Sequence, residues 1–382
     1  MIVAVLRDTA EGERRVALIP ASLPALIKSG LEIVVETGAG ASAGFPDAAY
    51  VEKGARIAAN RAEALGAAEV ALSVRPLRGD AAGLTARHAV VGFLDPLAAP
   101  QAIQKFAGGG GTAFALELLP RTTRAQAMDV LSSSATVVGY KAVLMAAAAL
   151  PRMFPMMMTA GGTLTPARVF VIGGGVAGLQ AIATARKLGA VVQAYDVRPA
   201  VKEQVESLGG KFVELPIEAG DAQDAGGYAK AMDESFYRRQ REMMAKVIAG
   251  CDVVISTAAV PGKKAPVLIT AEMVDAMPPG SVVVDVAAEQ GGNCEVTQAG
   301  KDVVRNGVTV MGPLNLAASV PYHASQMYAK NVANFLALIV KDGALKVDTA
   351  DDIVRETLVA RGGEVVHPRV REALGLPAPV TA

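Results

Sequence analysis

Three glycines between residues 168 and 178 have a spacing that suits phosphate chemistry. The segment reads RVFVIGGGVAG, in which Gly173, Gly175 and Gly178 match the pattern G-x-G-x-x-G. In that pattern the first glycine allows a tight turn, the second lets a pyrophosphate approach the backbone, and the third lets a helix pack closely on a strand. Glycines also serve ordinary turns, so the neighbouring residues must decide between the two interpretations.

The segments on either side of the glycines favour dinucleotide binding. Residues 168–172 predict a buried strand, and LQAIATARKLG after Gly178 predicts a helix whose free N–H groups would face the phosphates. The next predicted strand, 190–196, ends in Asp196, about twenty residues further on, where a carboxylate can accept both ribose hydroxyls of an adenosine. Strand, glycines, helix, strand and acid therefore follow one another in the order that a dinucleotide site requires.

Asp196 also predicts which dinucleotide binds. A 2′-phosphate about 4 Å from a carboxylate meets a repulsion of roughly 4 kcal/mol per unit charge at an effective dielectric of about 20, which favours NAD over NADP. Arg198 lies two residues further on, where the side chain would return to the same face of a strand and a guanidinium could pair with a phosphate. We interpret Arg198 as an exposed loop charge, and NADP remains the alternative.

The composition fits a protein of parallel α/β layers. The chain has 382 residues, of which 52% are hydrophobic, and it has no Trp. Parallel sheets have strands that are buried on both faces, which suits this content, and the length suits about two domains. The 37 Lys and Arg residues balance 37 Asp and Glu residues, so no net charge draws the chain to nucleic acid or anionic lipid.

Cysteine, histidine and hydropathy patterns argue against three other classes of protein. The two cysteines lie far apart and no signal peptide is recognisable, which indicates a reducing cytoplasm. The three histidines show no metal-ligand spacing, and no metal site is predicted. The most apolar stretch, residues 142–158, is broken by Pro151 and Pro155 before it reaches the roughly 20 helical residues that cross a bilayer, so no membrane span is expected.

The order of predicted elements defines the fold that must position these residues. Strands are expected at 2–6, 31–36, 69–74, 89–94 and 112–116, with helices at 21–29 and 99–106, and then at 168–173, 191–195, 211–214, 252–256, 281–285 and 307–311. Such alternation predicts parallel sheets. A serine-capped helix at 132–150 could bridge two domains, and a helix at 322–340 could return to the first. We therefore predict an α/β fold of two Rossmann-like domains with parallel sheets, joined by long helices, with a cleft between them. The expected first domain is 1–131 plus 314–382, and the NAD(H)-binding domain is 132–313.

Two further stretches carry polar groups that the fold does not need. Residues 120–134 place Arg121, Arg124, Gln126, Asp129 and Ser132 just ahead of the bridging helix, and such groups suit a carboxamide with one acceptor and two donors. Residues 215–235 are rich in Gly, Asp and Ala, and they are too long for a simple connection. Gly226 and Gly227 would permit hinge motion, and Tyr228 supplies one large ring; a solvated insertion is the alternative.

These segments together resemble the proton-translocating nicotinamide nucleotide transhydrogenases. The similarity is to their NAD(H)-binding domain I, which some bacteria make as a separate soluble α subunit, and it covers the chain from residue 1 to about residue 345. Besides the glycine turn and the polar loop it rests on the motifs RVALIP (15–20), KEQVESLGGKFVEL (202–215), GGYAKAM (226–232), PGKKAPVLIT (261–270), GSVVVDVAAEQGGNC (280–294) and YAKN (328–331). The run GPLNLAASV (312–320) departs from the family's usual Thr-Asn-x-Pro-Ser-Arg sequence.

The resemblance implies roles for individual residues. Arg121, Gln126, Asp129 and Ser132 would contact the nicotinamide end of the nucleotide, Tyr228 would close a mobile loop, and Asp196 would hold the adenosine ribose. The full set expected to contact NAD(H) is Gly173, Gly175, Val176, Ala177, Gly178, Asp196, Val197, Arg198, Gly227, Tyr228 and Ala258. Hydride transfer between two nicotinamide C4 atoms needs no general acid or base, only positioning and exclusion of water, and a histidine-free loop suits that need.

The resemblance also implies an assembly. The family transfers hydride from NADH to NADP⁺, with NADP(H) on a domain of the β subunit and proton movement through the β subunit and a second, membrane-spanning α polypeptide. This chain would then be a homodimer in the cytoplasm, held at the inner membrane by its partners, without nucleic acid or metal.

Two other functions remain alternatives. Alanine dehydrogenase resembles the same domain and shares RVALIP, but that enzyme needs an acid/base, and its histidine corresponds here to Asp95. The lysine that binds its substrate corresponds here to Ser73, and His88 should point elsewhere. A non-catalytic NAD-sensing subunit would keep Asp196 and the glycines without needing Arg121, Gln126 and Asp129 together.

Overall fold

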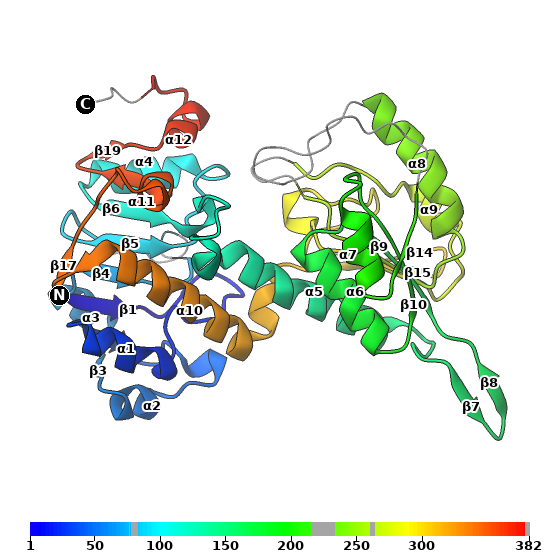
Figure 1. Ribbon diagram of the computed structural model, residues 1–382, viewed down its shortest axis with the longest axis horizontal. Coiled ribbons are helices and arrows are strands. Elements are labelled where there is room, and N and C mark those ends of the chain that lie inside the picture. Colours follow the sequence, from blue (N-terminus) through cyan, green and yellow to red (C-terminus); the bar gives the residue numbers. More distant parts are fainter. Residues whose placement is uncertain (76, 78–82, 215–233, 260–263, 379–382) are drawn as a thin grey trace. The chain divides into compact units, whose positions relative to one another are not determined.

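The computed structural model describes residues 1–75, 77, 83–214, 234–259 and 264–378 (Figure 1). The chain forms two compact units, which we describe separately. The first unit comprises Met1–Ser134 and Ala318–Ala382, and the second comprises Ala135–Ala317.

The first unit is built on an eight-stranded sheet with the order β19-β18-β6-β5-β4-β1-β2-β3. Its strands are β1 (Ile2–Val5), β2 (Glu32–Glu36), β3 (Arg56–Ala58), β4 (Val70–Leu72), β5 (Ala89–Gly92), β6 (Thr112–Ala115), β18 (Leu358–Arg361) and β19 (Glu364–Val365). Strands β1 to β6 pair in parallel, and the order reverses between β1 and β4. In open α/β sheets, ligands bind beyond the carboxyl ends of the strands at such a reversal.

Helices cover both faces of this sheet. They are α1 (Leu23–Lys28), α2 (Asp47–Glu52), α3 (Arg61–Ala67), α4 (Pro100–Gly108), α10 (Pro321–Ile339), α11 (Asp352–Thr357) and α12 (Pro368–Ala373). Helix α10 buries a full apolar face, and its Phe335 meets Phe114 of β6 edge to face with ring centroids 5.5 Å apart. The returning helix expected at 322–340 therefore belongs to the core of the first unit.

The end of the chain differs from the Pro- and Gly-punctuated tail that the sequence suggests. Strand β18 pairs antiparallel with β6, and β19 pairs antiparallel with β18, so the tail extends the sheet. The sheet is consequently mixed at this edge, although its six central strands are parallel as expected.

The second unit contains a seven-stranded sheet with the order β11-β10-β9-β12-β13-β15-β14. Its strands are β9 (Arg168–Ile172), β10 (Val191–Tyr195), β11 (Lys211–Phe212), β12 (Val253–Ser256), β13 (Val282–Asp285), β14 (Asp302–Arg305) and β15 (Val308–Met311). All pair in parallel except β14, which forms a hairpin with β15 through Asn306 and Gly307. Both turn residues have positive φ, as an Asn-Gly hairpin turn requires.

The four helices described around this second sheet are α6 (Val176–Lys187), α7 (Val201–Ser207), α8 (Glu234–Ile248) and α9 (Ala271–Asp275). The strand order reverses between β9 and β12, so each unit has the doubly wound, Rossmann-like topology that the sequence predicts. Short 3₁₀ helices occupy η1 (Pro20–Ser22), η2 (Ala41–Ala43), η3 (Leu116–Leu118), η4 (Gln126–Met128), η5 (Ala288–Gln290) and η6 (Leu316–Ser319).

Helix α5 (Val130–Ala149) runs from the first unit into the second. Among the described residues it is the one helix long and apolar enough to cross a membrane, a test that core helices of soluble proteins also pass. The sequence expectation of no membrane span considered only the more C-terminal stretch 142–158. Within the second unit, a Cβ on Gly139 of α5 would lie 2.1 Å from the carbonyl oxygen of Ala177, so α5 packs directly against the start of α6.

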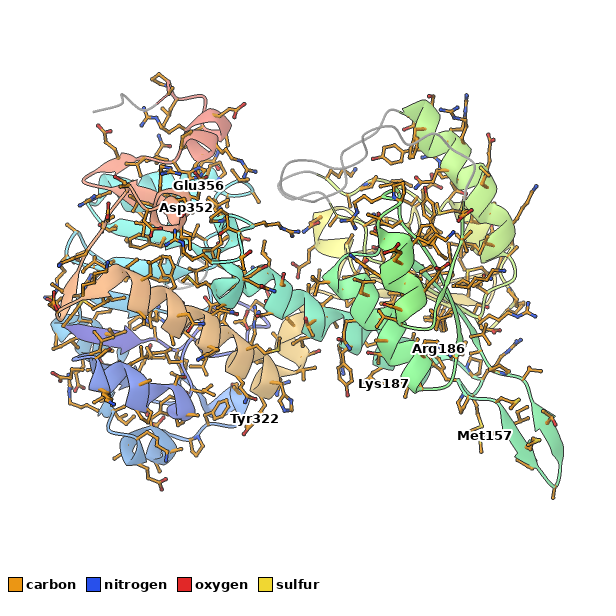
Figure 2. All side chains as sticks on the ribbon, viewed as in Figure 1. Met157, Arg186, Lys187, Tyr322, Asp352 and Glu356 are labelled. Carbon is orange, nitrogen blue, oxygen red and sulfur yellow. The ribbon has the colours of Figure 1, made fainter. Side chains whose placement is uncertain are left out.

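Two small hairpins complete the described structure. Strands β7 (Met157–Thr159) and β8 (Gly162–Leu164) project from the second unit, and β16 (Val340–Lys341) pairs with β17 (Ala344–Leu345). The β7–β8 hairpin carries exposed apolar side chains, among them Met157, labelled in Figure 2, and Met158, which is 80% exposed.

Candidate functional site

The three predicted glycines have three different structural roles. Gly173 follows β9 with φ +97°, which only glycine adopts readily. A Cβ on Gly178 would lie 1.8 Å from the carbonyl oxygen of Gly173, so α6 and β9 meet where no side chain fits. A Cβ on Gly175 would meet nothing within 4 Å, so open space lies in front of the start of α6. That space is where the sequence argument expects a pyrophosphate.

Gly174, to which the sequence argument assigns no role, connects the turn to the predicted acid. Its N–H donates to Oδ2 of Asp196 over 2.7 Å, and a Cβ at this position would lie 2.2 Å from Cγ1 of Val201. The run of three glycines is the only sequence signal for this role. The turn and the carboxylate are thereby fixed to one another.

Asp196 follows β10 and is only 8% exposed. Its Oδ1 accepts from the backbone N–H and Nε of Arg198, each over 2.8 Å, and its Oδ2 accepts from Nη2 of Arg198, also over 2.8 Å. The interpretation of Arg198 as an exposed loop charge is therefore wrong, because its side chain is 16% exposed and forms a two-pronged ion pair. Val197 between them is partly buried against the core of the second unit.

The next strand across the reversal, β12, ends beside the glycine turn. The N–H of Thr257 donates to the carbonyl of Ile172 over 2.8 Å, and its hydroxyl donates to the carbonyl of Gly173 over 3.1 Å. The following residue, Ala258, is half-buried, and its carbonyl accepts from Nδ2 of Asn293 over 2.8 Å. The predicted nucleotide contact at Ala258 therefore belongs to a backbone segment that is held in place.

A buried polar network stands behind this segment, and the sequence argument assigns it no role. Asp285, at the end of β13, is fully buried, and its carboxylate accepts from the N–H groups of Ala287, Asn293 and Cys294 and from the hydroxyl of Thr297. Asn293 in turn accepts from the hydroxyl of Ser256 over 2.7 Å. Four donors satisfy the carboxylate without a cation, which makes it a structural anchor.

The polar loop ahead of α5 lies in the first unit. Arg121 and Gln126 are exposed and Asp129 is half-buried. The carbonyl of Ala127 accepts from Nδ2 of Asn331 and Nδ2 of Asn334 on α10, over 3.0 and 2.8 Å. The loop is thus fastened to a core helix while Gln126 stays accessible.

Asp129 and Ser132 form one local structure. Ser132 donates to Asp129 through its N–H over 2.9 Å and through its hydroxyl over 2.5 Å. The expected serine cap at 132 is wrong, because α5 begins at Val130 and the carboxylate of Asp129 accepts from the first turn. Arg124 instead pairs with Asp351, with Nη1–Oδ2 and Nη2–Oδ1 distances of 2.6 and 2.8 Å, and with Asp352.

The structure brings the predicted residues together in two groups, one in each unit. Gly173, Gly175, Val176, Ala177, Gly178, Asp196, Val197, Arg198 and Ala258 lie at the carboxyl edge of the second sheet, and Arg121, Gln126, Asp129 and Ser132 lie in the loop of the first unit. Gly227 and Tyr228 lie outside the described residues.

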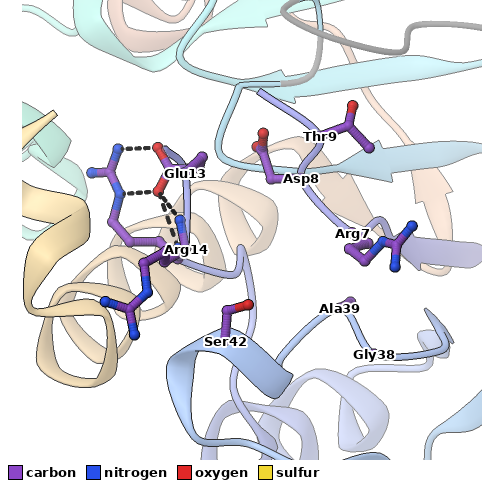
Figure 3. Close-up of a pocket in the computed structure, with 9 residues that line it drawn as sticks. Arg7, Asp8, Thr9, Glu13, Arg14, Gly38, Ala39 and Ser42 are labelled. Carbon is purple, nitrogen blue, oxygen red and sulfur yellow. Dashed lines mark hydrogen bonds and ion pairs between the residues drawn. The ribbon is translucent and has the colours of Figure 1, made fainter. Parts of the chain in front are cut away.

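The first unit has a polar pocket of about 380 Å³ at the carboxyl edge of its own sheet (Figure 3). Its lining residues are Arg7, Asp8, Thr9, Glu13, Arg14, Arg15, Gly38, Ala39 and Ser42. Glu13 accepts from Nε and Nη2 of Arg15, each over 2.7 Å, and lies 3.4 Å from Nε of Arg75. Arg15 and Arg75 are therefore paired with the same carboxylate.

The residues considered for acid/base chemistry serve as structural groups. Asp95 has φ +51° and lies 3.3 Å from Nη1 of Arg75. Ser73 is buried and His88 bonds to Thr85 and Leu65, away from the pocket. The sequence argument overlooks Arg75 itself, although a cation after β4 could have drawn attention.

Glu117, after β6, has a buried carboxyl although the residue as a whole is half-buried. Burial raises the pKa of this carboxyl to about 7, and the negative charge of Asp95 adds to the rise. The N–H groups of Leu94 and Asp95 donate to its Oε1 over 2.8 and 2.6 Å and oppose it.

Neither metal nor thiol chemistry is indicated by the described residues. No group of three or more potential metal ligands occurs among them. Cys251 and Cys294 are buried and unpaired, and burial raises the pKa of these thiols to about 12 and about 11. Neither thiol is poised to react at neutral pH.

Comparison with known proteins gives close matches over the whole chain. Residues 4–138 match the model "Alanine dehydrogenase/PNT, N-terminal domain", and residues 142–368 match "Alanine dehydrogenase/PNT, C-terminal domain". The chain is 47% identical to the first of the separately made alpha subunit polypeptides of the NAD(P) transhydrogenase of Rhodospirillum rubrum, covering 96% of this chain and 98% of that one. It is 31% identical to alanine dehydrogenase of Halomonas elongata, covering 98% and 97%.

A solved structure gives the same result. The transhydrogenase structure from Sinorhizobium meliloti is 45% identical, covers 96% of this chain and 100% of that chain, and superimposes with a TM-score of 0.87.

The open space before Gly175 leads to a first prediction. Gly175→Ala should leave thermal stability unchanged, because the new Cβ meets no protein atom, but should weaken NADH binding at least tenfold by obstructing the pyrophosphate. Gly178→Ala is the contrasting variant, and it should lose both stability and binding. Calorimetric titration with NADH and a thermal melt check both, and unchanged NADH affinity in Gly175→Ala would contradict the site.

The buried carboxyl of Glu117 predicts a pH-dependent stability. Because the folded pKa is raised from 4.5 to about 7, the unfolded chain loses this proton first as the pH rises, and the free energy of unfolding falls between those values. Glu117→Gln should therefore stabilise the protein by roughly 1 to 3 kcal/mol at about pH 8 and by much less at about pH 5. Urea unfolding followed by circular dichroism measures the difference.

The matched control for Glu117→Gln is Glu52→Gln, an exposed position in the same unit. It should give a small difference at both pH values. A gain for Glu117→Gln that does not change with pH would show that the carboxyl is not protonated in the folded protein.

Proposed function

The chain belongs to the alanine dehydrogenase/PNT family, and from that premise we propose that it is the NAD(H)-binding component of a proton-translocating transhydrogenase. It is an oxidoreductase of the NAD(P) transhydrogenase family. The proposed reaction is hydride transfer from NADH to NADP⁺ that is bound on a partner subunit. The identity of 47% to a transhydrogenase α subunit over nearly the full length supports this choice within the family.

The observation that carries the proposed nucleotide site is the joint geometry of the glycine turn and Asp196. Open space lies before Gly175 at the start of α6, where N–H groups and the helix dipole favour a pyrophosphate. Asp196 is fixed to the same turn by the N–H of Gly174. A dinucleotide that places its phosphates at the helix would therefore bring its adenosine ribose to Asp196.

The proposed role of the polar loop is to orient the nicotinamide. The bound nucleotide supplies a hydride at C4, whose transfer to another nicotinamide moves no proton. Gln126 offers an amide that can donate to and accept from a carboxamide, and Arg121 and the paired Asp129 and Ser132 surround it in sequence. The anchoring of Ala127 on α10 supports a positioning role, because orientation errors of about 1 Å can slow such reactions a hundredfold.

Alanine dehydrogenase activity is the second candidate, because the family includes it. That reaction needs a cation for the substrate carboxylate and a group that gives and takes a proton. In this chain Arg15 and Arg75 are both paired with Glu13, and Asp95 is paired with Arg75. These pairings weigh against an amino-acid substrate. The third candidate, a non-catalytic NAD-sensing subunit, does not account for the exposed Gln126 on an anchored loop.

The proposal includes the assembly expected from the sequence. The chain would form a homodimer, dock the NADP(H)-binding domain of a β subunit and act from the cytoplasm with that subunit and a second, membrane-spanning α polypeptide. The apolar β7–β8 hairpin, with Met158 80% exposed, supports contact with another protein surface. The proposed closing loop with Gly227 and Tyr228 falls outside the described residues.

Reconstitution tests the proposed function. The purified chain mixed with a candidate NADP(H)-binding domain should reduce NADP⁺ at the expense of NADH, and neither component alone should do so. A parallel assay with pyruvate, ammonia and NADH should give no turnover. Pyruvate-dependent NADH oxidation by the chain alone would instead identify an alanine dehydrogenase.

Shortening the amide at position 126 separates orientation from binding. Gln126→Asn should slow hydride transfer at least tenfold, because the amide no longer reaches the carboxamide, while the Kd for NADH changes less than about twofold. Single-turnover absorbance and calorimetry provide the two readings, with Gln104→Asn on the exposed face of α4 as the control. Loss of NADH affinity with a normal residual rate would show that Gln126 binds and does not orient.

A further inference from the structure

The carboxylate of Asp196 has no unused acceptor position. Oδ1 accepts from the backbone N–H and Nε of Arg198, and Oδ2 accepts from the N–H of Gly174 and Nη2 of Arg198, at distances of 2.7 to 2.8 Å. A carboxylate offers about four lone-pair sites. Two ribose hydroxyls can therefore bind Asp196 only if some of these donors leave.

The four donors differ in how easily they can leave. The N–H groups of Gly174 and Arg198 belong to the backbone around the glycine turn and the end of β10, and moving them would deform the site. The guanidinium of Arg198 is the end of a flexible side chain, although the pair is well shielded, with side-chain exposures of 16% and 5%. Its planar fork is a strong partner for a carboxylate in such surroundings.

We propose that the Arg198 guanidinium occupies the ribose position on Asp196 in the nucleotide-free protein, and that its displacement makes Arg198 a specificity-determining residue between NAD(H) and NADP(H). The inference rests on the proposed nucleotide site at the glycine turn. Arg198 then competes with the two hydroxyls of the adenosine ribose for the same oxygens.

The displaced guanidinium affects the two nucleotides in opposite ways. It stays tethered two residues from Asp196, beside the ribose, where a positive charge attracts a 2′-phosphate. Arg198 therefore opposes NAD(H), which must break the ion pair, and favours NADP(H), whose phosphate gains a partner. Without Arg198, the carboxylate would be open to hydroxyls and would repel a phosphate without compensation.

Arg198→Met tests the proposal, because methionine removes the charge and the fork but keeps an unbranched side chain. Calorimetric titration with 5′-AMP should show binding tightened about fivefold, and NADPH binding weakened about fivefold. The affinity for 2′,3′-dideoxy-AMP should change less than twofold, because that probe has no hydroxyls to place on Asp196. A purely structural role for Arg198 would alter all three probes together.

Two further variants sharpen the result. Arg198→Lys keeps a cation beside the ribose without the two-pronged contact, so it should tighten 5′-AMP binding and retain NADPH binding. The control Arg186→Met removes a like charge at the C-terminal end of α6 (Figure 2), where its guanidinium contacts the carbonyl of Ala190, and it should change none of the affinities.

The outcomes distinguish this inference from the proposed function. If the wild-type chain binds NADH but Arg198→Met leaves 5′-AMP affinity unchanged or weaker, the displacement is wrong and the nucleotide site stands. If Arg186→Met has the same effect as Arg198→Met, the effect is a long-range charge effect and the inference fails. If the wild-type chain binds neither NADH nor 5′-AMP, the nucleotide site fails and the inference with it.

Discussion

The close approach of β9 and α6 is the constraint on which the rest of the proposed site depends. A Cβ on Gly178 would lie 1.8 Å from the carbonyl oxygen of Gly173, so the helix can start where it does only because that atom is absent. This contact sets the direction of α6, leaves open space before Gly175, and brings Gly174 within hydrogen-bond distance of Asp196. Phosphate and ribose recognition therefore follow from one packing contact between a helix and a strand.

Buried polar groups then make the surroundings rigid. Asp285 anchors Asn293, and Asn293 holds the carbonyl of Ala258 beside the glycine turn. The first unit uses the same strategy, because two asparagines of α10 hold the loop that carries Gln126. A reaction that moves only a hydride depends on such fixed positions more than on groups that exchange protons. The pairing of Arg15 and Arg75 with Glu13 is consistent with this emphasis.

The sequence predicted the features that depend on backbone pattern. The glycine spacing, the buried strands around it and the acid after β10 were all recognisable, because steric demands and periodicity leave a direct trace in residue types. Features that depend on side-chain direction were not. Spacing could not show that Arg198 turns back onto Asp196, that Asp129 and not a serine caps α5, or that Glu13 joins Arg15 to Arg75. Strand β18 was missed because an edge strand of four residues pairs antiparallel with a partner far away in sequence.

The central claim is that this chain positions a nicotinamide for direct hydride transfer and contributes no proton chemistry. The most direct measurement follows an isotope: NADH deuterated on the transferred face of C4 is mixed with the chain, NADP⁺ and an NADP(H)-binding domain, and the NADPH formed is analysed by mass spectrometry. The account predicts that the deuterium is recovered in full at C4 of NADPH and that no deuterium enters from D₂O when unlabelled NADH is used. Loss of the label to solvent, or its transfer only to an amino-acid product, would contradict it.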